Sequence, residues 1–346
     1  MPQTPAAQEP DPPALRRPEE FFDALHTLVG QDDLRLKLAS TFYQYLAFLH
    51  EPEAGRPNLL VYGRSGSGKT YAIQQCIAAA GLPVTMPSAA SLAPPGFRGR
   101  VFVDVLIDHW RRWKTDYGVI FLDEIDKWCA GAAKQNSRKP ADSSKVSSEL
   151  EMGGIALQQE LLRTIEGELV TFTDDAKDVE DLEDVVFDTG HVFWIFGGAF
   201  VHLDRYVRHR LRNTHLSEEE AWEHAVPEDF KGYGMTHELA DRISTWAWTK
   251  PLKEVQMAQI LREQDVPRWV RRFAMLDIEL RLEAGAIGAC SQHAWQMQEG
   301  PRVARAMLNR GMDDILAHAS RRAATDPSWD RVVTVHAGNV RSGYID

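Results

Sequence analysis

The chain has 346 residues, of which 44% are hydrophobic and 26% are charged, so it can bury a sizeable core and fold as two domains. Its formal net charge of -11 argues against a surface devoted to nucleic-acid phosphates, and its three separated cysteines predict neither disulfides nor a zinc site. No apolar run approaches the roughly 20 residues that span a bilayer, and no secretory signal is present, so we expect a cytoplasmic protein without membrane association.

The predicted elements begin after a proline-rich segment, residues 1–20, which has few large apolar residues and is expected to be disordered. From Phe21 onward, helical spacing of apolar residues predicts helices over 21–30 and 33–49. The compact apolar run 58–62 predicts a strand, and residues 71–81 predict a helix that ends near a glycine.

Two more apolar runs, from Val119 and from His191, have the continuous hydrophobicity of strands that are covered on both faces. Strands that alternate with helices favour an α/β fold, with a parallel sheet and a ligand at the carboxyl ends of its strands. After Thr249 the pattern predicts helices over 252–264, 267–285 and 302–323. We therefore expect a large α/β domain over 21–248 and a small, mostly α-helical domain over 249–346.

The turn after the first strand, GRSGSGKT, matches the phosphate-binding pattern G-x-x-x-x-G-K-[ST]. Its glycines allow backbone N–H groups to surround phosphate oxygens, Lys69 reaches the β- and γ-phosphates, and Thr70 offers a hydroxyl to Mg²⁺. A strand before the turn and a helix after it are the context that this motif requires. The predicted nucleotide-binding residues here are Gly63, Arg64, Ser65, Gly66, Ser67, Gly68, Lys69, Thr70 and Tyr71.

The segment FLDEID supplies a second part of the predicted site. Its apolar strand delivers Asp123 to a carboxyl end, where a carboxylate can hold the magnesium shell, and Glu124 can activate the attacking water. Alone, such a segment would be a solvated acidic turn. Placed about 50 residues after a phosphate-binding loop, it predicts hydrolysis of ATP or GTP.

From about residue 20 onward the chain resembles the AAA+ ATPases of the ClpX and HslU unfoldase type. LVGQ resembles the family's VIGQ box, GVIFLDEIDK resembles GIVYIDEIDK, LQQELLRTIEG resembles VQQALLKLIEG, and FGGAF resembles CGGAF. The resemblance implies an AAA+ P-loop large domain followed by a helical lid domain, with ATP and Mg²⁺ as ligands. It also implies self-association into a ring, expected to be a hexamer, and it places Val29 near the adenine.

Three further motifs of the resemblance bear on the mechanism. HELADRI resembles PEFIGRL, which implies that Arg242 is an arginine finger reaching a neighbouring subunit's site, and GPRVARA resembles GARGLRS, which implies that Arg302 is the sensor-2 arginine. PPGFRG resembles the pore loop GYVG, so Gly96, Phe97, Arg98 and Gly99 are the predicted pore loop, with Phe97 gripping substrate by apolar contact. Composition alone would make the arginines surface ion-pair partners and Phe97 a core residue.

The chain also departs from the family. No zinc-binding N-terminal domain is expected, and residues 201–226 are charged and lack the IGF tripeptide, which argues against a Clp-type peptidase partner. Where a ClpX-like protein has a basic loop, Asp174–Asp188 is strongly acidic, which favours a basic protein substrate, although most charge runs are solvated loops. FGGAF offers no Asn or Thr as a sensor-1 group.

The leading hypothesis is an ATP-driven protein unfoldase or remodelling chaperone that works without an attached protease. A nucleic-acid translocase or loader is the alternative; Arg98 and Arg100 favour it, and the acidic segment counts against it. A scaffold that binds nucleotide as a switch is the third reading, against which Glu124 and Arg242 count.

Overall fold

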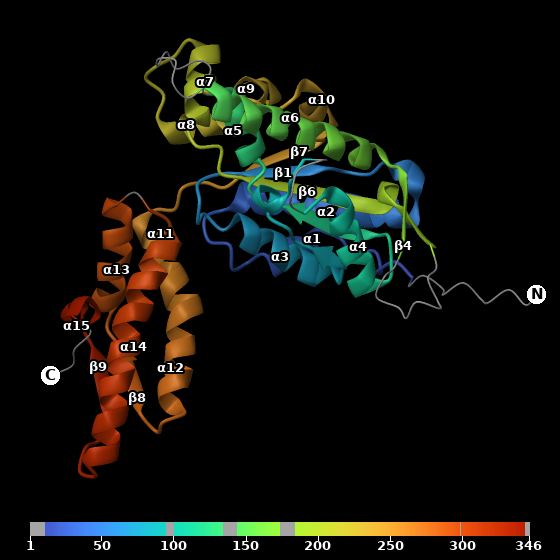
Figure 1. The fold of residues 1–346 in the computed structure, drawn as a ribbon. Helices are drawn as coiled ribbons and strands as arrows, with labels where there is room; N and C mark the ends of the chain where they lie inside the picture. The colour runs from blue at the N-terminus through green and yellow to red at the C-terminus, as the bar shows by residue number, and fades with distance from the viewer. Residues whose placement is uncertain (1–10, 95–99, 134–143, 174–183, 298, 343–346) are drawn as a thin grey trace, which may run out of the picture. The chain divides into compact units, whose positions relative to one another are not determined.

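The computed structural model describes residues 11–94, 100–133, 144–173, 184–297 and 299–342 (Figure 1). The chain divides into two compact units, and each is described by itself. The first comprises Met1–His26, Asp33–Gly63 and Lys69–Thr249, and the second comprises Thr27–Asp32, Arg64–Gly68 and Lys250–Asp346.

The first unit is built on a five-stranded parallel sheet with the strand order β2-β3-β6-β1-β7 (Figure 1). The strands β1 (Leu59–Tyr62), β3 (Gly118–Leu122) and β6 (Val192–Gly198) are buried along their whole length, because their continuous apolar runs face helices on both sides. The edge strands are β2 (Val84–Thr85) and β7 (Thr245–Trp248). The predicted parallel sheet and its three apolar strands are confirmed.

Helices cover both faces of this sheet, with α1, α2 and α3 on one face and α5, α6, α9 and α10 on the other (Figure 1). On the first face the Phe193 ring lies 5.2 Å from that of Phe42 and 4.9 Å from that of Tyr45. On the second, Trp194 belongs to a core cluster with Trp128 and Phe230. The helices of this unit are α1 (Pro18–Ala24), α2 (Asp32–His50), α3 (Lys69–Ala80), α4 (Phe102–Trp113), α5 (Asp126–Ala133), α6 (Ser144–Glu166), α7 (Leu203–Leu211), α8 (Glu218–Glu223), α9 (Pro227–Tyr233) and α10 (His237–Arg242).

A separate antiparallel hairpin, β4 (Leu169–Thr173) and β5 (Asp184–Asp188), precedes β6. Its buried face includes Phe172 and Phe187. The end of the acidic segment is therefore a strand and not the solvated loop that its charge favours, because Val185 and Phe187 alternate with outward-facing positions. Residues 174–183 lie outside the described residues.

The second unit is mainly helical, and α13 packs against α11, α14 and α15. The predicted helix over 267–285 is wrong in its second half. The helix ends at Ala274, Asp277 adopts a positive φ of 55°, and residues 279–282 form a strand with alternating burial. The elements are α11 (Glu254–Ile260), a π-helical turn η5 (Leu261–Asp265), α12 (Val266–Ala274), β8 (Glu279–Leu282), α13 (Ala284–Gln296), α14 (Pro301–Thr325), β9 (Val332–Val335) and α15 (Ala337–Ser342); β8 and β9 pair in parallel.

Candidate functional site

The phosphate-binding motif forms the turn between β1 and α3, as its pattern requires. Gly63 and Gly66 have φ angles of 148° and 76°, which favour glycine. A Cβ on Gly63 would lie 1.9 Å from Thr249 Oγ1, so a larger residue could not keep this backbone path. The turn therefore has the conformation in which backbone N–H groups can face an anion.

Lys69 is the first residue of α3, and only 8% of its surface is exposed. Its Nζ donates a hydrogen bond of 2.7 Å to the carbonyl of Gly63. Burial lowers the pKa of Lys69, and the nearby carboxylates of Asp123 and Asp126 oppose this change. A cation held inside the phosphate-binding turn is the group that a triphosphate requires.

Thr70 and Asp123 come together at the carboxyl end of the sheet. The Thr70 hydroxyl donates to Asp123 Oδ2 at 2.9 Å, and the backbone N–H of Glu124 donates to Asp123 Oδ1 at 2.9 Å. Asp123 directly follows β3, and Gly197 of β6 leaves room for its carboxylate, because a Cβ there would lie 2.7 Å from Asp123 Oδ1. A hydroxyl and a carboxylate are oxygen ligands suited to Mg²⁺, which binds proteins through few carboxylates together with substrate phosphates.

Glu124 is exposed, has a positive φ of 65°, and accepts a hydrogen bond of 2.9 Å from the Ser88 hydroxyl. The sequence analysis missed Ser88, because its proximity to Glu124 depends on the bridge between Ser88 and Asp123 beyond β2 and β3. Such a hydrogen bond can hold a carboxylate in place without blocking both of its oxygens.

Asp126 is a second residue that the sequence analysis did not single out, although it stands in the motif FLDEID. It is 3% exposed, and burial raises the pKa of its carboxyl group. Its Oδ1 has no hydrogen-bond partner among the described residues. Lys69 is a cation close enough to lower this pKa, so the two groups share one buried electrostatic environment. We call Lys69 with the carboxylates of Asp123 and Asp126 the Lys69 cluster.

Arg242 ends α10 and is not part of the Lys69 cluster. Its guanidinium forms an ion pair with Glu166 at the end of α6, and the two side chains are 54% and 45% exposed. Its backbone carbonyl accepts a hydrogen bond of 3.0 Å from Asn58, next to β1. The backbone of Arg242 is therefore anchored to the sheet while its charged end is at the surface.

Arg302 and Val29 lie in the second unit. Arg302 is exposed in the first turn of α14, and a Cβ on Gly66 would lie 3.4 Å from Arg302 Cβ. Val29 packs against the apolar core of this unit. The predicted pore-loop residues Gly96, Phe97, Arg98 and Gly99 lie outside the described residues, so their role stays a prediction.

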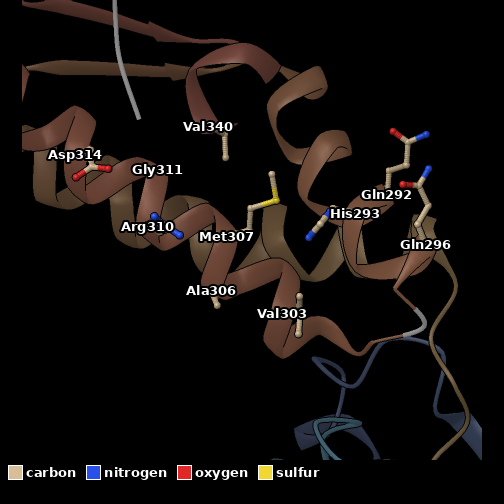
Figure 2. A pocket seen from close by; sticks show the side chains of 10 residues that line it. All are labelled: Gln292, His293, Gln296, Val303, Ala306, Met307, Arg310, Gly311, Asp314 and Val340. Atoms are coloured by element: carbon tan, nitrogen blue, oxygen red, sulfur yellow. The ribbon is translucent and has the colours of Figure 1, made fainter. Parts of the chain in front are cut away.

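A hollow of ≈ 640 Å³ lies on the second unit and is lined by residues of α13, α14 and α15, including His293, Arg310 and Asp314 (Figure 2). Its lining includes none of the predicted nucleotide-binding residues. Of the described helices, none is long and apolar enough to cross a membrane. The three cysteines are buried and form no disulfide among the described residues.

Comparison with known proteins finds one matching ATPase family model and several ClpX relatives. The model of the ATPase family associated with various cellular activities (AAA) matches residues 59–180, which include β1, the phosphate-binding turn and β3. The chain is 26% identical over 334 residues to the ATP-dependent Clp protease ATP-binding subunit ClpX of Treponema denticola, covering 88% of this chain and 78% of that protein. The chain is an ATPase that is similar to ClpX over most of its length.

Other relatives match a similar share of this chain. ClpX of Azotobacter vinelandii is 26% identical over 339 residues, covering 88% of this chain and 74% of that protein. ClpX of Bacteroides thetaiotaomicron is 23% identical over 325 residues, covering 86% and 75%. The similarity thus extends well beyond the phosphate-binding turn.

Proposed function

We propose that this ClpX-like ATPase is a protein unfoldase or remodelling chaperone that assembles as a ring, expected to be a hexamer, and hydrolyses ATP between neighbouring copies. The observation that carries the proposal is the convergence of Lys69, Thr70 and Asp123 at the carboxyl ends of β1 and β3, next to Glu124. ATP hydrolysis requires an anion cradle, oxygen ligands for a metal and a carboxylate for water, and this edge of the sheet holds all three.

In this proposal Lys69 and the backbone of Gly63–Gly68 bind the phosphates, and Thr70 and Asp123 hold Mg²⁺. When bound, Mg²⁺ neutralises charge that develops on the phosphate oxygens. Glu124 orients and deprotonates the attacking water, and Ser88 holds its carboxylate. Val29 contacts the adenine, and Arg302 senses the γ-phosphate.

Arg242 acts on the site of a neighbouring copy in this proposal. The support is its exposure and its place outside the Lys69 cluster of its own chain. Exposed ion pairs contribute only about 0–1 kcal/mol, so Arg242 can leave Glu166 at little cost. An arginine finger supplied from another chain accelerates phosphoryl transfer by about 10³ to 10⁵.

We propose further that the substrate is a polypeptide, gripped by Phe97, and that the acidic segment Asp174–Asp188 favours basic clients. Arg100, which supported a nucleic-acid substrate, forms an ion pair with Asp108, so its charge is partly neutralised within the chain. Residues 201–226 form α7 and α8 where a peptidase-docking loop would lie, which supports action without a Clp-type peptidase.

The test is capture of substrate by the variant Glu124→Gln. This variant should bind ATP, assemble and retain proteins while its turnover falls by about 10² to 10⁴. Lys69→Ala is the matched control, because it should bind no ATP and retain nothing. Recovery of nucleic acid without protein would refute the unfoldase proposal and favour a translocase.

A further inference from the structure

Three separate segments of the second unit are joined by one chain of polar contacts. Gln264 in the π-helical turn η5 donates through Nε2 to the carbonyl of Thr27 at 3.0 Å. Its Oε1 accepts from Arg305 Nη2 at 3.4 Å, and Arg305 Nε donates to Asp265 Oδ1 at 2.7 Å. Arg305 therefore connects α14 with η5, and Gln264 continues the connection to the segment Thr27–Asp32. We call these contacts the Arg305 network.

The Arg305 network contains a buried charge. Asp265 is 3% exposed, and its Oδ2 has no hydrogen-bond partner among the described residues. Besides Arg305, the side chain of Arg268 lies within ion-pair distance of Asp265, with Nη1 at 3.8 Å from Oδ1. A buried carboxylate is strongly disfavoured without a bonded partner, so the ion pair fixes Arg305 in place. η5 is π-helical. This conformation is rare in proteins, and where it occurs it is frequently at a functional site.

The segment Thr27–Asp32 has two further contacts within this unit. Besides Gln264, the buried Gln31 donates to the Lys250 carbonyl at 2.8 Å and accepts from the Lys250 N–H at 2.9 Å. Gly30, with a φ of 69°, lies so close to Gln256 that a Cβ would meet its side chain at 2.1 Å. Val29 is thus presented by a backbone whose position depends on this unit's own side chains.

Arg305 stands one turn after Arg302 on α14, so the two share a face of the helix. The start of this helix lies against the phosphate-binding turn, since a Cβ on Gly300 would lie 3.1 Å from the Gly66 carbonyl. The Arg305 network therefore joins the segment proposed to contact the base with the helix turn proposed to contact the γ-phosphate.

We infer that Arg305 is a positioning residue that couples recognition of the nucleotide base to the placement of Arg302, and so makes binding selective for a triphosphate that carries a base. This inference rests on the proposed roles of Val29 and Arg302. It concerns nucleotide binding alone, and does not depend on what the motor acts upon.

The experiment compares two ligands of the full chain in the presence of Mg²⁺: ATP, and inorganic tripolyphosphate, which lacks base and sugar. Arg305→Gln should weaken ATP binding by about tenfold, a typical coupling between sites, while the affinity for tripolyphosphate changes by less than about twofold. Arg321→Gln, an exposed arginine further along α14, is the matched control and should change neither affinity.

A second variant separates coupling from folding. Gln264→Ala removes the contact with Thr27 and leaves the Asp265–Arg305 ion pair intact, so it should fold and show the same selective loss of ATP affinity. The double variant should lose no more than about tenfold, because both changes break one chain of contacts. Equal losses for ATP and tripolyphosphate, or an unchanged preference in Gln264→Ala, would overturn the inference.

The outcomes also distinguish this inference from the proposed function. A selective loss of ATP affinity together with an empty Glu124→Gln trap would leave the coupling intact and refute the unfoldase. Protein capture by Glu124→Gln, with no change of ligand preference in Gln264→Ala, would support the unfoldase and refute the coupling.

Discussion

Two cationic residues of the first unit, Lys69 and Arg242, differ in burial and in the number of groups of their own chain that surround their charge. Lys69 is 8% exposed, bonded to the Gly63 carbonyl and close to two carboxylates. Arg242 is 54% exposed and has one exposed carboxylate as its ion-pair partner. The surroundings of Lys69 are therefore supplied by its own chain, whereas the charge of Arg242 lies at the surface.

The difference follows from the local structure. Lys69 begins α3, which follows the buried strand β1 after the turn Gly63–Gly68, and its Nζ is hydrogen-bonded to the Gly63 carbonyl at the end of that strand. Arg242 ends the six-residue helix α10, and only its backbone is tied to the sheet, through Asn58. A long side chain at such a place can exchange partners, because an exposed ion pair holds it weakly. Substitutions of Lys69 and Arg242 should therefore impair different steps, the first ATP binding and the second hydrolysis.

We expect the most severe loss of turnover from Arg242→Ala. Turnover should fall by about 10³-fold or more, because a transition-state cation is lost, while ATP affinity and the melting temperature change little. Steady-state hydrolysis and equilibrium ATP binding measure the two quantities. Arg205→Ala, an exposed arginine on α7, is the control and should retain full turnover.

Mixing two inactive variants tests whether Arg242 acts between copies. Arg242→Ala retains Glu124, and Glu124→Gln retains Arg242, so random mixing at equal amounts should restore about a quarter of native turnover, from interfaces that combine both. No recovery on mixing, with assembly demonstrated, would show that Arg242 serves its own chain.

The sequence predicted the parts of this site that depend on contiguous residues. The turn Gly63–Thr70 carries its own conformational requirements in its glycines, and Leu122 and Asp123 mark where a buried strand ends. The strands β1, β3 and β6 were predictable because each is apolar without interruption. These features need no knowledge of what lies beside them.

The contacts of Asp123 and Glu124 could not be predicted in this way, because they join distant segments. Gly197 approaches Asp123 only through the pairing of β6 with β3, and Ser88 approaches Glu124 only beyond the end of β2. The strand β8 was missed for a local reason. The helical spacing of Trp269 and Phe273 was extended into residues whose burial alternates with period two.

Gly197→Ala should have an intermediate effect, on the concentration of Mg²⁺ that hydrolysis requires. The added Cβ would meet Asp123 Oδ1 at 2.7 Å and the buried Phe121 ring at 2.8 Å, so the carboxylate must move away from Thr70. Half-maximal turnover should require about tenfold more Mg²⁺, which corresponds to a loss of about 1.4 kcal/mol in the free energy of Mg²⁺ binding. Magnesium titration of ATP hydrolysis measures it.

The matched control is Gly288→Ala in α13, where a Cβ meets nothing within 4 Å. Alanine inside a helix stabilises it relative to glycine by about 0.5–1 kcal/mol, so the magnesium requirement should stay unchanged. If folded Gly197→Ala needs no additional Mg²⁺, then the position of the Asp123 carboxylate does not control metal binding.

The mildest change is expected at Glu166, the ion-pair partner of Arg242. Glu166→Gln keeps the shape of the side chain and removes its charge, which should change the free energy of unfolding by no more than about 0.5 kcal/mol. Turnover of the assembled protein should rise by about threefold or less, because Arg242 no longer has to separate from a carboxylate. Chemical denaturation and hydrolysis rates measure these changes.

Asp241→Asn provides the control on the same helix, since it breaks the Lys231–Asp241 pair of 2.7 Å and leaves Arg242 with Glu166. It should leave turnover unchanged. A loss of turnover in Glu166→Gln as large as that in Arg242→Ala would mean that the two side chains act as a fixed pair. Arg242 would then act within its own chain, as Lys69 is proposed to do, and the difference between the two residues would disappear.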